Sequence, residues 1–145
     1  MLAPTSLEPP VTDGPRWYRT RIRRYGPLAG LLVPAVLGGI AWAALRVSDA
    51  GWSGAVGLIA GVCAAPALLA AGAPFGDDGL YPIAVAASAV MWLLIGWLAA
   101  RKATRNPMAT WRDYWRHYGW LCGGICLGAC AALAVSAWVV ADPLL

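Results

Sequence analysis

Hydrophobic residues fall in four long runs, and polar residues gather in the short segments between them. The runs cover 27–45, 52–73, 81–100 and 119–141, and none contains Asp, Glu, Lys, Arg or His. With a helical rise of about 1.5 Å per residue, about 20 apolar residues cross the roughly 30 Å hydrocarbon layer of a membrane. A helix also satisfies its own backbone hydrogen bonds in lipid. Each run therefore predicts a membrane-spanning helix.

The overall composition agrees with this pattern. The chain has 145 residues, of which 60% are hydrophobic and 12% are charged, and its mean hydropathy is +0.62. A soluble domain carries about 25% charged residues. We predict an all-α integral membrane protein whose membrane domain, a four-helix transmembrane bundle, covers 27–141. A disordered basic tail over 1–26 and a short tail over 142–145 are expected to flank it.

Positive charge occurs in two clusters of five residues, one before the first run and one between the third and fourth runs. The cytoplasmic side of a membrane protein usually carries the excess of Lys and Arg. Four crossings place the two clusters on opposite faces, so the charges do not choose an orientation. We expect these residues to orient the protein or to contact anionic lipid: Arg16, Arg19, Arg21, Arg23, Arg24, Arg101, Lys102, Arg105, Arg112 and Arg116.

An alternative topology removes the charge conflict. If 52–73 enters the membrane and turns back near Pro66, both basic clusters lie on one face. Against this, an uncharged run of about 22 residues normally spans. We therefore predict that 52–73 crosses. The alternatives are that 52–73 re-enters, that the protein inserts in both orientations, or that one basic cluster violates the charge rule.

The segment 108–120, MATWRDYWRHYGW, concentrates aromatic residues before the last run. Thr110 is a candidate N-cap with Asp113 three residues later, and the aromatic residues that follow recur at i, i+3, i+4 and i+7 on one helix face. Trp and Tyr favour the headgroup level of a membrane. The pattern predicts a short interfacial helix before the last span, with a bend at Gly119. The expected membrane-interface anchors are Trp17, Tyr18, Trp111, Tyr114, Trp115 and Tyr118.

Candidate chemistry is sparse. His117 and Asp113 have i, i+4 spacing, but no nucleophile stands beside them, and a lone His offers too few ligands for a metal. Three cysteines, Cys122, Cys126 and Cys130, line one side of the last run, where we expect them to pack as small apolar residues. We predict no catalytic residue, no metal site and no cofactor. Nucleic-acid binding is not expected either, because no soluble fold presents the Arg and aromatic residues.

Two GxxxG motifs predict close helix packing, since small residues let helix backbones approach each other. They are Gly57 with Gly61, and Gly124 with Gly128. Their contacts are expected either inside the bundle or with another copy or a larger membrane protein.

These features favour a small, non-enzymatic accessory or scaffold subunit of a membrane assembly. A small oligomeric channel, carrier or holin-like pore is the alternative. The runs contain no Asp, Glu, Lys, Arg or His, which argues against ion-coupled transport. An intramembrane enzyme using Asp77, Asp78 or His117 ranks last. Richness in Ala, Gly, Arg and Trp suggests a GC-rich bacterial genome, so we expect a multi-pass protein of a bacterial plasma membrane.

Overall fold

The structure is a computed structural model that describes residues 14–47, 51–72 and 78–141, and every regular element in these ranges is a helix. In chain order the elements are α1 (Pro15–Ala29), α2 (Leu32–Val47), α3 (Gly51–Ala64), α4 (Ala67–Ala70), the 3₁₀ helix η1 (Asp78–Leu80), α5 (Tyr81–Ala103) and α6 (Trp111–Ala141). The prediction of an all-α chain is confirmed for these residues.

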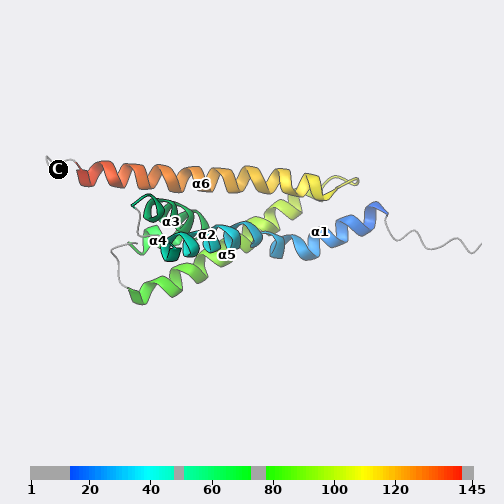
Figure 1. The fold of residues 1–145 in the computed structure, drawn as a ribbon. Helices are drawn as coiled ribbons and strands as arrows, with labels where there is room; N and C mark the ends of the chain where they lie inside the picture. The colour runs from blue at the N-terminus through cyan, green and yellow to red at the C-terminus, as the bar shows by residue number, and fades with distance from the viewer. Residues whose placement is uncertain (1–13, 48–50, 73–77, 142–145) are drawn as a thin grey trace, which may run out of the picture.

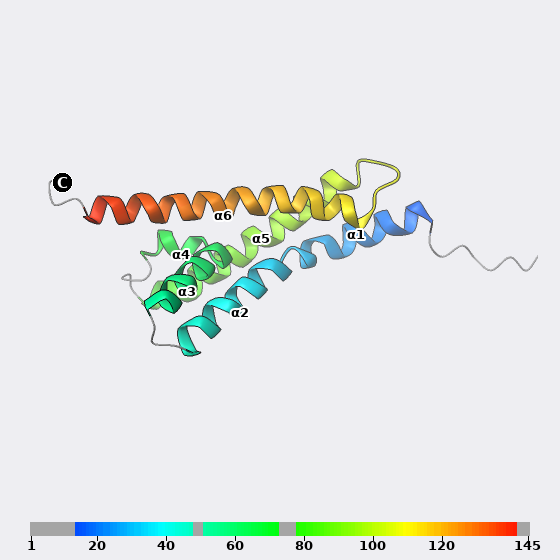
Figure 2. The same ribbon diagram turned by 45° about the horizontal axis from the view of Figure 1, so that its top comes forward.

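The helices form an elongated bundle (Figure 1). Helices α1 and α2 follow one another as a bent rod, α5 lies against this rod, and α6 runs along one side of the molecule. Helices α3 and α4 sit at the end where α2 finishes, and α3 packs back against α2 (Figure 2). The outer surface carries many large apolar side chains, such as Leu45, Ile83 and Leu127. A surface of this kind suits a lipid environment.

Three helical stretches are long and apolar enough to cross a membrane: Arg16–Arg46, Tyr81–Ala103 and Trp111–Val139. The fourth expected span is different. In place of one helix over 52–73, the chain forms the 14-residue α3, a break at Pro66 and the four-residue α4. At about 1.5 Å per residue, α3 is roughly 21 Å long, which is shorter than the roughly 30 Å hydrocarbon layer. The expectation of four full-length spans is corrected to three long apolar helices and one shorter one.

The basic N-terminal segment is also more ordered than predicted. Residues 15–26 were expected to belong to a disordered tail, but they form most of α1. Pro15 occupies the first helical turn, where its missing N–H costs nothing. Ile22 is fully buried in the core. The segment therefore has an apolar face, which was not recognised among its five arginines. Residues 1–13 and the predicted tail 142–145 lie outside the described residues.

The predicted interfacial helix is not a separate element. Helix α6 continues from Trp111 through Gly119 to Ala141 without interruption. A glycine inside a helix costs about 1 kcal/mol relative to alanine, which a long helix tolerates. The bend expected at Gly119 is therefore absent, and the aromatic segment forms the first two turns of the last long helix.

Both basic clusters meet at one end of the bundle. The beginning of α1, the end of α5 and the beginning of α6 lie together there (Figures 1 and 2). Arg23 in α1 donates from Nε to the Thr104 hydroxyl that follows α5, at 3.2 Å. Because α2 leads away from this end and α5 returns to it, the chain reaches the second cluster on the same side as the first. Hereafter we call this region the basic end.

Candidate functional site

The bend between α1 and α2 is closed by a tyrosine from α6. Pro34 has no N–H, so the carbonyl oxygen of Gly30 lacks the donor that a continuous helix would provide. The hydroxyl of Tyr118 donates to this oxygen at 2.6 Å. Tyr118 is 1% exposed. A buried carbonyl that would otherwise be unsatisfied thus receives its hydrogen bond from a helix 88 residues further along the chain.

A second tyrosine repeats the contact one turn away. The hydroxyl of Tyr114 donates to the carbonyl oxygen of Gly26 at 2.7 Å, and that oxygen also accepts from the N–H of Gly30. The rings of Tyr114 and Tyr118 stack with centroids 5.8 Å apart. Both side chains belong to the buried core. Their polar tips therefore meet backbone groups inside the protein, whereas the sequence suggested that they meet headgroups.

The break at Pro66 is closed in the same manner by α5. The indole N–H of Trp92 donates to the carbonyl oxygen of Ala64 at 2.7 Å, and the N–H of Ala67 donates to the hydroxyl of Ser88 at 3.2 Å. Ser88 and Trp92 are both buried and lie one helical turn apart. Non-helical backbone at membrane depth is tolerated where protein covers it. These two side chains provide that cover. In the sequence, the sign of this role is a Ser and a Trp four residues apart on one face of α5.

Helices α1 and α5 contact each other closely through small residues. A methyl group added at Gly30 would lie 2.8 Å from the Cα atom of Gly96, and one added at Gly26 would lie 2.6 Å from the Cβ atom of Ala100. Gly26 and Gly30 form a GxxxG motif, and Gly96 and Ala100 form its small-residue counterpart. This pair was not predicted, because Gly26 stands outside the first apolar run.

The glycines that were predicted to pack divide into two groups. Gly57 and Gly61 face α2, where added methyl groups would lie 2.8 Å from the Leu45 side chain and 3.7 Å from Ala41 respectively. Gly124 and Gly128 face open space, with no neighbouring atom within 4 Å of an added methyl group. The first motif therefore lies inside the bundle, while the second is free on the outer side of α6.

The cysteines of α6 face α3. The Sγ atom of Cys63 lies 4.0 Å from that of Cys130, and all four cysteines are free thiols. Cys122 and Cys126 are partly buried on the same face. Across the described ranges, no group of three or more His, Cys, Asp or Glu side chains has an arrangement suited to a metal ion.

Asp113 and His117 have separate local roles. The Asp113 carboxylate accepts from the N–H and the hydroxyl of Thr110, at 3.1 and 2.9 Å. His117 places Nδ1 2.8 Å from the backbone oxygen of Asp113. The carboxylate thus caps the beginning of α6 as a capping box does. It bonds to Thr110, while the imidazole of His117 meets the backbone oxygen of Asp113.

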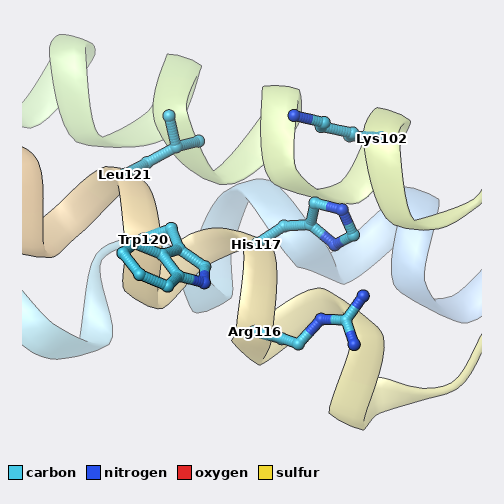
Figure 3. A pocket seen from close by; sticks show the side chains of 5 residues that line it. All are labelled: Lys102, Arg116, His117, Trp120 and Leu121. Carbon is cyan, nitrogen blue, oxygen red and sulfur yellow. The ribbon is translucent and has the colours of Figure 1, made fainter.

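Hollows open at the basic end between its helices and along α1. One hollow of about 350 Å³ is lined by Arg23, Trp97, Ala100 and Arg101. A second, of about 340 Å³, is lined by Arg16, Arg19, Thr20 and Arg23. The third lies where Lys102 of α5 approaches α6 and measures about 480 Å³ (Figure 3); its lining residues are Lys102, Arg116, His117, Trp120 and Leu121.

The other predicted charges and anchors lie on or near the surface of this end. Arg21 and Arg24 place their guanidinium groups over the rings of Trp17 and Tyr25, at 4.6 and 5.9 Å from the centroids. Arg105, Arg112 and Trp115 are exposed, and Tyr18 and Trp111 are partly exposed. Their roles as anchors and orienting charges stay predictions. No protein-family model matches the chain, and no curated protein or solved structure matches it either.

Proposed function

We propose that the chain is a multi-pass membrane protein with three crossing segments and a re-entrant hairpin formed by α3 and α4. The three crossings are the α1–α2 rod, α5 and α6, whose lengths and composition suit a bilayer. In this topology the basic end faces the cytoplasm. The α3–α4 hairpin enters from the opposite side and returns to it.

The position of the charges supports this topology. Both basic clusters share one end, so a single orientation satisfies the positive-inside rule for both.

The break at Pro66 would be costly in lipid, at several kcal/mol per unsatisfied backbone group. Trp92 and Ser88 supply the missing partners at this break. These contacts offset the cost of placing this break within the membrane.

Exposed tryptophans provide further support. Trp42, Trp52 and Trp138 stand near the end opposite the basic end and are largely exposed. Trp97 and Trp120 are exposed towards the basic end. Tryptophan gathers at both water interfaces of a membrane protein. Two separated groups of exposed Trp, with apolar surface such as Leu94 and Leu127 between them, match this distribution.

Within the membrane, we propose that the protein serves as a non-enzymatic accessory or scaffold subunit. The observation that carries this proposal is the open glycine face of α6. Close contacts inside the bundle involve Gly26, Gly30 and Gly96. By contrast, a methyl group added at Gly124 or Gly128 would have no neighbouring atom within 4 Å. Membrane helices use such faces for backbone contact with another helix. Leu127, beside Gly128, and Trp138, further along α6, are exposed as well.

Co-purification in a mild detergent tests this role. The wild-type protein is expected to elute with a larger membrane protein in fixed stoichiometry, and Gly124→Leu together with Gly128→Leu should abolish the association. Gly39→Leu is the matched control, because Gly39 also faces open space but lies on α2. A homo-oligomer that conducts ions or solutes in liposomes would favour the alternative of a small pore. A monomer unaffected by the α6 variants would contradict both.

A further inference from the structure

Arg23 stands between two of the hollows at the basic end. It lines the hollow between α1 and α5 together with Trp97 and Arg101, and it also lines the hollow on α1 with Arg16 and Arg19. None of the described residues that line these two hollows is acidic. Guanidinium groups that lie close together without a carboxylate repel each other, and an anion between them relieves the repulsion.

The guanidinium of Arg23 is held in place by one of its nitrogens. Its Nε donates to the hydroxyl of Thr104 at 3.2 Å. Thr104 is 0% exposed, and its hydroxyl donates in turn to the carbonyl oxygen of Ala100 at 2.8 Å. This arrangement orients the Arg23 fork and leaves its two terminal NH₂ groups for another acceptor. Paired N–H groups of this kind match the oxygen atoms of a phosphate.

Arg101 is held by an aromatic ring, which does not neutralise its charge. Its guanidinium carbon lies 5.2 Å from the centroid of the Trp97 ring. A cation–π contact fixes the side chain and leaves its N–H groups available at the rim. Arg23 and Arg101 thus face one hollow from two helices, each oriented by a neutral partner.

The surface beside this hollow is apolar in one direction. Val90, Leu94 and Trp97 are exposed and follow the same face of α5 as Arg101, at spacings of i, i+4, i+7 and i+11. The face therefore carries a positive charge at the membrane boundary and an apolar strip that leads towards the membrane centre. A ligand with an anionic head and a long hydrocarbon chain fits both parts, whereas a free phosphate uses the charged part alone.

We propose that the hollow between α1 and α5 binds the phosphate headgroup of an anionic phospholipid. Arg23 and Arg101 bind the phosphate oxygens, Thr104 is a positioning residue for Arg23, and the acyl chain lies along Trp97, Leu94 and Val90. The phosphate chemistry follows from the residues themselves. The choice of a lipid as its source rests on the proposed membrane topology.

Native mass spectrometry of the full chain in a neutral detergent tests the proposal. The protein is titrated with dioleoyl phosphatidylglycerol or with dioleoyl phosphatidylcholine, and the lipid-bound fraction is measured. We expect the wild type to bind the anionic lipid about tenfold more tightly than the zwitterionic one. Arg23→Gln and Arg101→Gln should each weaken binding of the anionic lipid about tenfold, as expected for loss of a charge-assisted hydrogen bond.

Arg46→Gln is the matched control, because Arg46 also lies over a tryptophan, Trp42, at 5.3 Å but at the opposite end of the bundle. It should leave binding unchanged. Thr104→Val keeps both arginines and should weaken binding by a smaller factor, which separates positioning from charge. Circular dichroism and the melting temperature establish that each variant is folded. Wild-type affinity in both arginine variants, or an equal loss in Arg46→Gln, would overturn the site.

Competition with soluble glycerol 3-phosphate distinguishes the two sources of phosphate. We expect millimolar glycerol 3-phosphate to displace the lipid weakly, because it lacks the chain that contacts α5. Displacement at the same concentration as the lipid would overturn the lipid assignment. A carbonate wash of membranes reports separately on membrane integration. Release of the protein by the wash would contradict the proposed topology, even if the purified protein still bound phosphate through Arg23.

Discussion

The hydroxyl of Tyr118 lies 2.6 Å from the carbonyl oxygen of Gly30, which is the oxygen that Pro34 deprives of its helical donor. One side chain on the last helix thereby completes the hydrogen bonding of the first. The same principle operates where Trp92 caps Ala64 beside Pro66. The breaks at Pro34 and Pro66 are thus each matched to a donor on a neighbouring helix, and this pairing gives the first prediction.

Tyr118→Phe should destabilise the protein by about 1–2 kcal/mol, because the ring stays packed but the buried Gly30 carbonyl loses its partner. Pro34→Ala restores a backbone N–H to that carbonyl. In the Pro34→Ala background the tyrosine substitution should therefore cost less. Unfolding in detergent micelles, measured as a double-mutant cycle, gives both free energies. Equal costs in the two backgrounds would show that the hydroxyl does not substitute for the missing N–H.

Ser88→Ala should accelerate amide hydrogen exchange at Ala67, whose N–H donates to the serine hydroxyl. Loss of the acceptor leaves this N–H free to open towards water. Ser136→Ala is the control, because the Ser136 hydroxyl bonds to the Ala132 carbonyl within its own helix. Exchange measured by mass spectrometry should rise around Ala67 in the first variant and stay constant there in the control. Unchanged exchange in Ser88→Ala contradicts the capping role.

Gly30→Ala should destabilise the bundle by about 1–3 kcal/mol, because the added methyl group meets the backbone of Gly96 at 2.8 Å and the helices must separate. Gly128→Ala has open space around it and should be neutral or stabilising by up to about 1 kcal/mol. Melting temperatures of the two variants in the same detergent decide the matter. Similar losses in both would argue against the close contact of α1 and α5.

Single cysteines report the topology. In a background where the four native cysteines are replaced by alanine, Cys is placed at Gly51, at Leu80 or at Arg105, all of which are exposed. An impermeant maleimide added to intact cells should label the first two positions and not the third, because α3 and α4 return to the side from which they enter. Labelling of Gly51→Cys and protection of Leu80→Cys would restore the topology with four crossings.

The sequence predicted the helical class and the apolar segments well, because these depend on local composition and period. The contact between Thr110 and Asp113 was equally readable, since its partners are three residues apart. Which helices meet was harder to predict. Gly26 and Gly96 pack together although they are 70 residues apart in the sequence. Gly26 also lies in an arginine-rich segment that was predicted to be a disordered tail.

The tyrosines illustrate the same limit at the candidate site. A Tyr beside an apolar run satisfies its hydroxyl either at the headgroups or on a buried backbone oxygen, and both solutions have the same local pattern. For Tyr118, the partner is decided by Pro34, a residue of another helix, which leaves the Gly30 carbonyl without its helical donor. Similarly, the length of 52–73 favoured a full span. The chain breaks at Pro66 instead, and the backbone at this break is capped by two side chains of α5, Ser88 and Trp92.

The long separation between Tyr118 and Gly30 also has a consequence for biogenesis. Ribosomes add about 5–20 residues per second, so the 88 residues between these partners correspond to roughly 4–18 s of synthesis. During this interval the first helix has left the ribosome while its Gly30 carbonyl lacks a permanent donor. Until the last helix is made, this carbonyl needs a hydrogen bond from water or from another protein. Translation that stops before Tyr118 should therefore yield a first helix that is prone to extraction and degradation.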